Sequence, residues 1–259
     1  MKKSKIAVLV AMVVVLAFSL AACGGSDKSS SDKTVYKVGT EPTFPPFDTT
    51  DEDQNIVGLD MDLIKAIGED QDFDVEFENL SFDGLIPALK AGNIDIVAAG
   101  MNKDDEDRQK EVDFSDSYYE SKLFVAVTED NTTIKSVEDL TPDMKVAAQT
   151  GTTGASKVKE LKDAGKIKEA VILDGLDTCM MKLINGDVSA VINDKPVTEA
   201  YIKKQPDKIK MVGEALNAEN YGFAVQKGNA ELVEKINNGL KHIKENGTYD
   251  KLVDEWFNK

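Results

Sequence analysis

Two stretches of the chain share one pattern and decide the fold: Leu85–Gly100 (LIPALKAGNIDIVAAG) and Cys179–Asp194 (CMMKLINGDVSAVIND). Each begins with an apolar helical face, stops at a glycine (Gly92 or Gly186), and continues as an apolar strand. A chance match between two helix–turn–strand units is the alternative explanation. As an internal repeat, the pattern predicts two lobes of similar build.

Short β-rich runs alternate with helical stretches along the remaining chain. Apolar stripes predict three helices: one that begins near Asp60, one that ends before Gly92 and one that ends before Gly247. Alternating strands and helices predict mainly parallel sheets with helices on their faces. The predicted strands are Val35–Gly39, Val75–Glu78, Ile94–Ala99, Leu123–Val127, Lys145–Ala148, Val171–Leu173, Val188–Asn193 and Phe223–Val225.

Both repeated strands run directly into polar or backbone-exposing residues. The first ends in Gly100-Met101-Asn102 and the second in Asn193-Asp194. Ligands of open α/β sheets bind at the carboxyl ends of strands. Two facing lobes would therefore place both strand ends across one cleft.

The first residues predict export. Basic residues between Met1 and Lys5 precede the apolar run Ile6–Leu20, which is typical of a signal peptide over residues 1–22. The run ends in Leu20-Ala21-Ala22-Cys23, which resembles the bacterial lipobox, so we expect cleavage before Cys23 and its lipidation, with palmitate among the acyl chains. A retained signal anchor is the alternative. Residues 23–33 are rich in Ser and Gly and predict a flexible tether.

Composition limits the partners. Removing the three leader lysines from the 31 basic residues leaves 28 against 47 acidic residues, a net charge of −19. This argues against nucleic acid as a partner. With Cys23 lipidated, only Cys179 remains, so we expect no intrachain disulfide and Cys179 in the core.

Many short motifs, in order, carry a resemblance to the extracellular solute-binding proteins of polar amino acid ABC importers, solute-binding family 3. The resemblance covers Val35 to Phe257. The motifs are Gly39-Thr40-Glu41, Phe44-Pro45-Pro46-Phe47, Val57-Gly58-Leu59-Asp60-Met61-Asp62-Leu63, Phe82-Asp83-Gly84-Leu85, Arg108 before Val112-Asp113-Phe114-Ser115-Asp116, Gln149-Thr150-Gly151-Thr152-Thr153, Asp194-Lys195-Pro196-Val197, and Asn246-Gly247-Thr248-Tyr249 before Trp256-Phe257.

The resemblance implies an α/β, two-lobed periplasmic-binding-protein-like fold of type II, with mixed sheets flanked by helices and a hinge of two crossover strands. Residues 34–121 plus 222–259 would form lobe 1, and residues 122–221 lobe 2. It also implies a monomeric, extracytoplasmic lipoprotein on the cell membrane, which delivers a free amino acid to a membrane-embedded ABC permease and its ATPase. No cofactor is implied.

The resemblance also assigns ligand contacts, and each has a physical reason. Unpaired charges of a zwitterion are costly once they leave water. Arg108 can hold the carboxylate with two parallel hydrogen bonds, and the backbone N–H of Thr153, at the start of a helix reaching about Ala164, adds a donor. Asp194 accepts from the ammonium group, with the Gly100 carbonyl and Asn102 as further partners.

The remaining predicted contacts surround the ligand side chain. Phe44 and Phe82 are implied as aromatic walls. Glu41 matches a position that faces the distal end of the ligand, so it either pairs with a cationic side chain, as in arginine or lysine, or bonds within its own loop. Gln149 and Asn193 are neutral amides at matching positions and do not select a ligand.

One departure from the family pattern affects the loop before Arg108. Seven residues separate Gly100 from Arg108, where six are usual. Either Asn102 or Lys103 could therefore replace the usual Thr or Ser contact.

Other candidates favour a structural role. Asp51, Asp53 and Asn55 fit a hairpin turn better than a calcium loop, and the acids from Asp104 to Asp107 fit the first turn of a helix better than a metal site. His242 is expected at the surface. Rival functions are a dehydratase-like enzyme on the same fold, which needs a tuned acid or base in the cleft, and a sensor lobe that reports to a separate receptor. We predict that the chain is not an enzyme.

Overall fold

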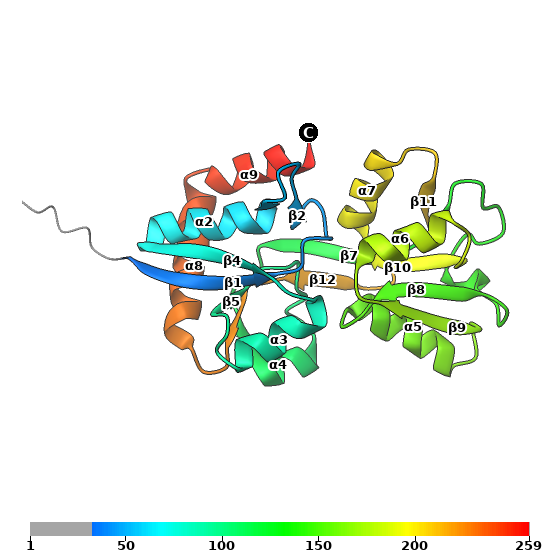
Figure 1. The fold of residues 1–259 in the computed structure, drawn as a ribbon, viewed down its shortest axis with the longest axis horizontal. Coiled ribbons are helices and arrows are strands. Elements are labelled where there is room, and N and C mark those ends of the chain that lie inside the picture. The colour runs from blue at the N-terminus through cyan, green and yellow to red at the C-terminus, as the bar shows by residue number, and fades with distance from the viewer. Residues whose placement is uncertain (1–32, 259) are drawn as a thin grey trace, which may run out of the picture. The chain divides into compact units, whose positions relative to one another are not determined.

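The computed structural model describes residues 33–258, and these contain two mixed sheets flanked by helices (Figure 1). The signal peptide, Cys23 and nearly all of the tether predicted above lie outside the described residues. The prediction of mainly parallel sheets was wrong. Parallel and antiparallel pairs occur in both sheets because strands from distant parts of the sequence complete each one.

The first sheet has five strands. β1 pairs in parallel with β4 and β5, whereas β13 is antiparallel to β5 and β6. β13 comes from near the C-terminus, so this sheet needs both ends of the described chain. In spatial order its strands are β4 (Phe73–Asn79), β1 (Thr34–Thr40), β5 (Ile96–Val97), β13 (Ala224–Gln226) and β6 (Val112–Phe114).

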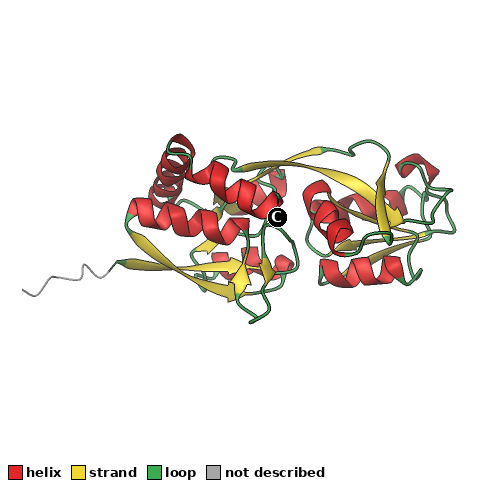
Figure 2. Cartoon of the chain, turned by 90° about the horizontal axis from the view of Figure 1, so that it is seen from above, coloured by secondary structure: helices red, strands yellow, loops and turns green. Residues whose placement is uncertain are grey.

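The second sheet has six strands, and β7 is its longest. β8 pairs in parallel with β9 and β10, and β7 is antiparallel to β10, β11 and β12. Figures 1 and 2 show β7 and β12 running between the two sheets. The strands are β11 (Ile209–Val212), β7 (Tyr119–Thr128), β10 (Ala190–Asp194), β8 (Lys145–Gln149), β9 (Glu169–Leu173) and β12 (Ala218–Tyr221).

Helices cover both sheets, and a short hairpin forms a separate two-stranded sheet. Apolar faces pack into the core, as in α2, which buries Met61, Ile64 and Ile67 as its stripe predicted. The elements are the hairpin β2 (Thr49–Thr50) and β3 (Ile56–Val57), the 3₁₀ turn η1 (Val137–Asp139), and the helices α2 (Leu59–Gln71), α3 (Phe82–Lys90), α4 (Glu106–Glu111), α5 (Thr153–Asp163), α6 (Leu176–Ile184), α7 (Lys195–Lys204), α8 (Ala230–Glu245) and α9 (Thr248–Phe257).

The internal repeat is confirmed down to its hydrogen bonds. After α3, the N–H of Gly92 donates to Leu89 O (3.1 Å), and after α6 the N–H of Gly186 donates to Leu183 O (3.0 Å). Both glycines have positive φ, 72° and 78°, the left-handed conformation that ends helices at lowest cost in glycine. The second unit therefore repeats the turn of the first, residue for residue.

The regular strand after the first turn is shorter than predicted. Only Ile96–Val97 is β-strand, although Asp95 N–H donates to Lys37 O (2.8 Å) and Ala98 N–H to Gly39 O (3.0 Å). The chain thus follows β1 over most of the predicted length, and only its middle has regular ladder geometry.

The N-terminus of α2 fixes the loop before it. The first N–H groups of a helix have no partner within the helix. Here Leu59 N–H donates to Pro46 O (2.9 Å) and Asp60 N–H to Phe47 O (3.0 Å). Gly58, at φ 148°, allows this approach, because a Cβ there would lie 2.0 Å from Phe47 O.

We predict that Gly58→Ala lowers the free energy of unfolding by about 3 kcal/mol or more, since it adds a clash with backbone to an unfavourable φ. Gly165→Ala is the control, because Gly165 also has positive φ (68°) but nothing lies within 4 Å of the place that its Cβ would take. The control should cost only about 1 kcal/mol in urea unfolding. Equal losses in the two variants would contradict the role of Gly58.

Candidate functional site

Loops and helices that follow strands of the first sheet, together with residues of the second sheet and the start of α5, line one cavity whose empty volume, including the part open to solvent, is about 330 Å³. Nine of the ten ligand contacts predicted from the sequence line it, and Asn193 does not. The lining consists of Glu41, Phe44, Phe82, Ala99, Gly100, Asn102, Arg108, Gln149, Thr152, Thr153, Asp194 and Glu219.

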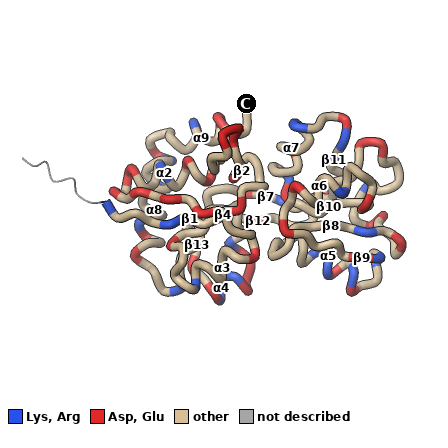
Figure 3. Tube along the Cα trace, viewed as in Figure 1, with Lys and Arg blue, Asp and Glu red and all other residues tan. Residues whose placement is uncertain are grey.

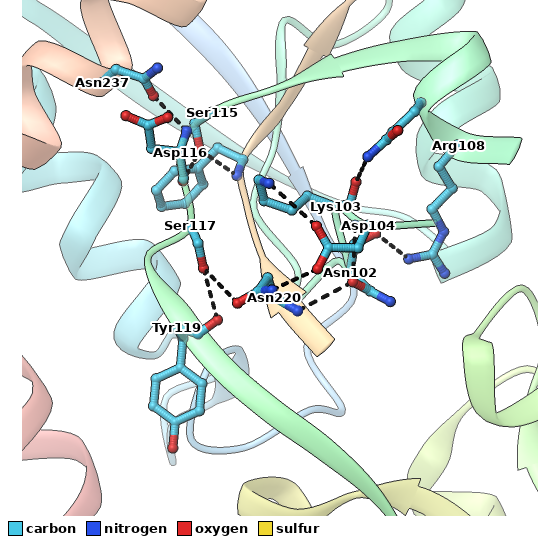
Figure 4. A network of polar contacts seen from close by, with 12 residues as sticks. Asn102, Lys103, Asp104, Arg108, Ser115, Asp116, Ser117, Tyr119, Asn220 and Asn237 are labelled. Carbon is cyan, nitrogen blue, oxygen red and sulfur yellow. Dashed lines mark hydrogen bonds and ion pairs between the residues drawn. The ribbon is translucent and has the colours of Figure 1, made fainter. Parts of the chain in front are cut away.

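Arg108 lies on α4 and is 9% exposed. The Asp105 carboxylate accepts from the N–H groups of Asp107 and Arg108, so the predicted acidic first turn caps this helix. The Arg108 guanidinium donates to Asn102 O (3.1 Å), as Figure 4 shows, and to Gly151 O (2.9 Å). It also lies 5.4 Å from the centre of the Phe82 ring. Burial lowers the pKa of Arg108, and nearby acidic groups oppose that shift.

The loop before Arg108, which is one residue longer than usual in the family, is hydrogen-bonded to β12. Asn102 Oδ1 accepts from Asp104 N–H (3.1 Å) and Asn220 N–H (3.3 Å), and Lys103 N–H donates to Asn220 O (2.7 Å). Figure 4 shows this network, including the ion pair of Lys103 with Asp104. Of the two alternatives for the usual Thr or Ser position, Asn102 lines the cavity and Lys103 is not in its lining.

The aromatic side chains and Gly100 form one side of the cavity. Phe44 is 7% and Phe82 8% exposed. Gly100 has φ 53°, and a Cβ there would lie 2.6 Å from the Phe44 ring. A residue with a side chain at this position would therefore displace Phe44 or strain the backbone.

Glu41 and Gln149 meet across the cavity. Gln149 Nε2 donates to Glu41 Oε2 (2.8 Å) and to Asp174 O (3.0 Å). Glu41 Oε2 also accepts from Thr43 Oγ1 (2.8 Å), so the bond within its own loop, considered above, is present. Burial raises the pKa of Glu41, while these hydrogen bonds oppose the shift.

The start of α5 also faces the cavity. Thr152 is the N-cap, and its side chain accepts from Ala155 N–H (3.0 Å). Thr153 is the first helical residue, as predicted, and α5 ends at Asp163. Backbone N–H groups at a helix N-terminus favour anions, so this part of the lining is suited to a carboxylate.

Asp194 is the last residue of β10, and its carboxylate is directed at β7 and β12. Its Oδ1 accepts from Ser121 Oγ (3.0 Å) and from the hydroxyl of Tyr221. Burial, and then the charge of Glu219, raises the pKa of Asp194 well above its usual value. Asn193 instead turns toward α7, where its amide donates to Thr198 Oγ1 (3.2 Å).

Sequence reasoning missed three residues of the lining: Ala99, Thr152 and Glu219. The Gly151-Thr152-Thr153 stretch could have indicated Thr152 as a helix cap. Glu219 carried no such signal, because β12 was not predicted and its place depends on pairing with β7.

A buried acid supports the cavity wall from behind. Asp60 Oδ2 accepts from Gly100 N–H (2.8 Å) and from the Tyr118 hydroxyl (2.6 Å), while Oδ1 has no hydrogen-bond partner. Burial raises the pKa of Asp60 to about 7. Asp60 thus fixes the backbone whose carbonyl was predicted to meet the ligand.

The structural interpretations of the other candidates are confirmed. Asp51 accepts from Asn55 within the β2–β3 hairpin. Cys179 is fully buried, and His242 is at the surface, where it contacts Asp70. Among residues 33–258, no cluster of His, Cys, Asp and Glu could hold a metal ion, and no helix has the length and apolar character to cross a membrane.

A larger groove lies between α7 and α9 and includes Pro46, Pro196, Ile202 and Trp256. Neither a buried arginine nor a helix N-terminus with a predicted anion donor contributes to its lining. The charged residues of the groove, Glu199, Lys203, Lys204 and Glu255, are half-buried or exposed, so it does not offer a zwitterion the buried charge partners that the smaller cavity has.

Comparison with known proteins identifies the family of this chain. The model of the bacterial extracellular solute-binding proteins, family 3, matches residues 36–259. A probable histidine-binding protein of Neisseria gonorrhoeae is 34% identical, with 94% of this chain and 92% of that protein covered. A putative ABC transporter arginine-binding protein 2 of Escherichia coli K12 is also 34% identical, over the full length of both.

A solved structure is also similar to this chain in fold and sequence. An ancestral arginine-binding protein bound to arginine has a TM-score of 0.82 and 44% identity, covering 87% of this chain and 99% of that one. The fold is therefore the two-lobed fold that the sequence predicted. The chain belongs to family 3 of the bacterial extracellular solute-binding proteins.

Asp60 should make stability depend on pH. Its pKa is higher in the folded chain, about 7, than its ordinary value of 3.8, so folding takes up a proton between these values. The contribution of Asp60 to the free energy of unfolding is therefore complete below about pH 4 and is lost as pH rises through 7, by roughly 4 kcal/mol in all. Asp60→Asn should remove this loss. Urea unfolding of both proteins from about pH 4 to 8 measures it, and an unchanged slope in the variant would contradict the assignment.

Proposed function

We propose that the chain is the substrate-binding component of an ABC importer and that its ligand is a free cationic L-amino acid, with L-arginine the best candidate. One observation carries the proposal: Arg108, Asp194 and Glu41 line the same small cavity. These three side chains match the carboxylate, the ammonium group and a cationic side chain of one amino acid.

Arg108 and the start of α5 would bind the carboxylate. A guanidinium has five N–H donors in a planar fork, and within the described residues Arg108 uses two of its hydrogen bonds on protein carbonyls. A carboxylate beside Thr153 would meet both the remaining donors and the helix N-terminus. The ammonium group would then lie toward Asp194, with the Gly100 carbonyl and Asn102 beside it.

The charge balance of the lining favours a cationic ligand. Arg108 is the basic residue of the lining, against the acids Glu41, Asp194 and Glu219. A buried excess of carboxylates is costly unless cations approach it. Phe44 and Phe82 would enclose the apolar stem of the ligand, and Glu41 would pair with its distal cation. The named arginine-binding relatives support the same choice.

We further propose that two lobes, residues 34–121 plus 222–259 and residues 122–221, close on the ligand about β7 and β12. Three hydrogen bonds between the proposed lobes support this closure. They run from Arg108 to Gly151 O, from Gln149 to Glu41, and from the Tyr201 hydroxyl to Thr43 O (3.0 Å). A closed form signals an occupied site to the permease, as hinge closure does in periplasmic binding proteins.

The proposed setting is outside the cytoplasmic membrane. After removal of residues 1–22, the lipid on Cys23 would anchor a monomer, and residues 23–33 would serve as its tether. The permease and its ATPase are the proposed partners. Acidic residues recur along the described chain (Figure 3), which fits a protein that remains in solution above the membrane.

Ligand identity can be tested on residues 34–259 with a thermal-shift panel of the twenty amino acids, ornithine and cystine. A ligand at about a thousand times its Kd adds roughly 4 kcal/mol to stability, which raises the Tm by about 8 to 16 °C for this size. L-Arginine should give the largest shift. If no amino acid raises the Tm, the proposed function is wrong.

We predict that Arg108→Ala weakens L-arginine binding by about 2 to 5 kcal/mol, because the ligand carboxylate would be left without its buried partner. Lys110→Ala is the matched control, since Lys110 is an exposed cation on the same helix. The measurement is the Kd of L-arginine for both variants by calorimetry. Comparable affinities for the two would rule out Arg108 as the carboxylate site.

Glu41→Gln tests the distal contact. It keeps the shape of the side chain but removes the charge, so L-arginine should bind at least tenfold more weakly while a neutral amino acid is affected less. The ratio of the Kd values for L-arginine and L-glutamine, in both proteins, is the measurement. A ratio that does not change would show that Glu41 only bonds within the protein.

A further inference from the structure

Thr43 lies in the turn after β1, between the cavity and two helices of the second proposed lobe. It is half-buried, and its N–H donates to Glu41 O (2.8 Å) within the turn. Its backbone carbonyl accepts from the hydroxyl of Tyr201 on α7 (3.0 Å). β1 belongs to the first sheet, whereas α6 and α7 lie beside the second (Figure 1). Thr43 is therefore at a junction of the proposed lobes.

The Thr43 hydroxyl takes part in two hydrogen bonds at once. Its Oγ1 donates to Glu41 Oε2 (2.8 Å) and accepts from the N–H of Leu176 (3.3 Å), the first residue of α6. A threonine hydroxyl has one proton to donate and lone pairs with which to accept, so one arrangement of the group makes both bonds. The hydroxyl thus joins a carboxyl group of the cavity lining to a helix of the opposite proposed lobe.

The N-terminus of α6 has no side-chain cap of its own. The first N–H groups of a helix have no partner within the helix, and the N-cap side chain commonly supplies an acceptor. The N-cap of α6 is Gly175, which makes no side-chain hydrogen bond. In α5, by contrast, Thr152 caps its own helix by accepting from Ala155 N–H. Thr43 therefore supplies from the opposite proposed lobe the acceptor that Gly175 lacks.

Gln149 connects the same groups by a second route. Its Nε2 donates to Glu41 Oε2 (2.8 Å) and to Asp174 O (3.0 Å), which lies just before α6. Glu41 Oε2 thus accepts from Thr43 and Gln149, and each of these two residues also bonds to the segment 174–176. Connected hydrogen bonds strengthen one another where water is excluded. The bonds that orient Glu41 and the bonds that hold the start of α6 are therefore one network.

We propose that Thr43 is a positioning residue that couples recognition of the ligand side chain to closure of the lobes. Its hydroxyl directs the Glu41 carboxylate and caps α6, and we call this pair of bonds the Thr43 latch. The inference rests on the proposed function and assigns the residue that links its distal contact to its closure. In an open form Thr43 and Leu176 separate, and water replaces the cap. A ligand cation at Glu41 and the closed form then stabilise each other.

Thr43→Val tests the latch, because it removes the hydroxyl and keeps the branched shape. Closure would leave the N–H of Leu176 without its acceptor, so L-arginine should bind about five- to fiftyfold more weakly. Since the latch forms after the ligand has entered, the dissociation rate should rise while the association rate changes less than about threefold. Thr43→Ser keeps the hydroxyl and should bind within about threefold of the unaltered protein. Stopped-flow mixing of the full chain with L-arginine measures both rate constants.

The matched control is Thr49→Val. Thr49 is a half-buried threonine of β2 and does not line the cavity, so its replacement should leave both rate constants as they are. Urea unfolding of the ligand-free chain separates the latch from simple support of the fold. Because the latch belongs to the closed form, Thr43→Val should leave the ligand-free midpoint nearly unchanged. A lower midpoint with an unchanged dissociation rate would show a purely structural role.

A double-mutant cycle with Glu41→Gln tests whether Thr43 acts through Glu41. If it does, the loss of L-arginine affinity in the double variant should be at least about threefold smaller than the product of the two single losses. Losses that simply multiply would overturn the inference and leave the proposed function in place. So would a Thr43→Ser variant as weak as Thr43→Val, or a Thr43→Val variant that keeps its affinity. If L-arginine does not bind the unaltered chain, the proposed ligand is wrong and the inference falls with it.

Discussion

The buried Arg108 guanidinium is the constraint on which the site depends. It is taken out of water at the cavity wall, where it donates hydrogen bonds to two backbone carbonyls. A buried cation is tolerated only with partners of matching geometry. The surrounding structure supplies them: an acidic cap that orders α4, a loop bonded to β12, and the turn before α5.

The repeated helix–turn–strand unit explains why the site lies between the sheets. Each copy delivers a strand end to the cavity, Gly100 from the first and Asp194 from the second. The first contributes backbone, because Phe44 leaves no room for a side chain at Gly100. The second contributes a carboxyl group. Similar frames thus present different chemistry, as an asymmetric ligand such as an amino acid requires.

Acids are distributed in two layers around this frame. Glu41, Asp194 and Glu219 face the cavity, whereas Asp60 lies behind it and holds the N–H of Gly100. In the proposed function the first layer would attract a cationic ligand, and the second fixes the wall. Burial raises the pKa of both Asp60 and Asp194, so the free energy of unfolding depends on pH through both groups.

The residues alone predict the alternation of helices and strands and the repeat, because helix stops and strand ends are local features, and the family resemblance adds nine residues of the cavity lining through motif order. The mixed sheets and the place of Glu219 come instead from the tertiary structure, as does the direction of the Asn193 side chain toward α7. The first two depend on strands from distant parts of the chain pairing with one another. Spacing along the sequence does not encode such pairing, since it is the packing of the whole fold that selects it.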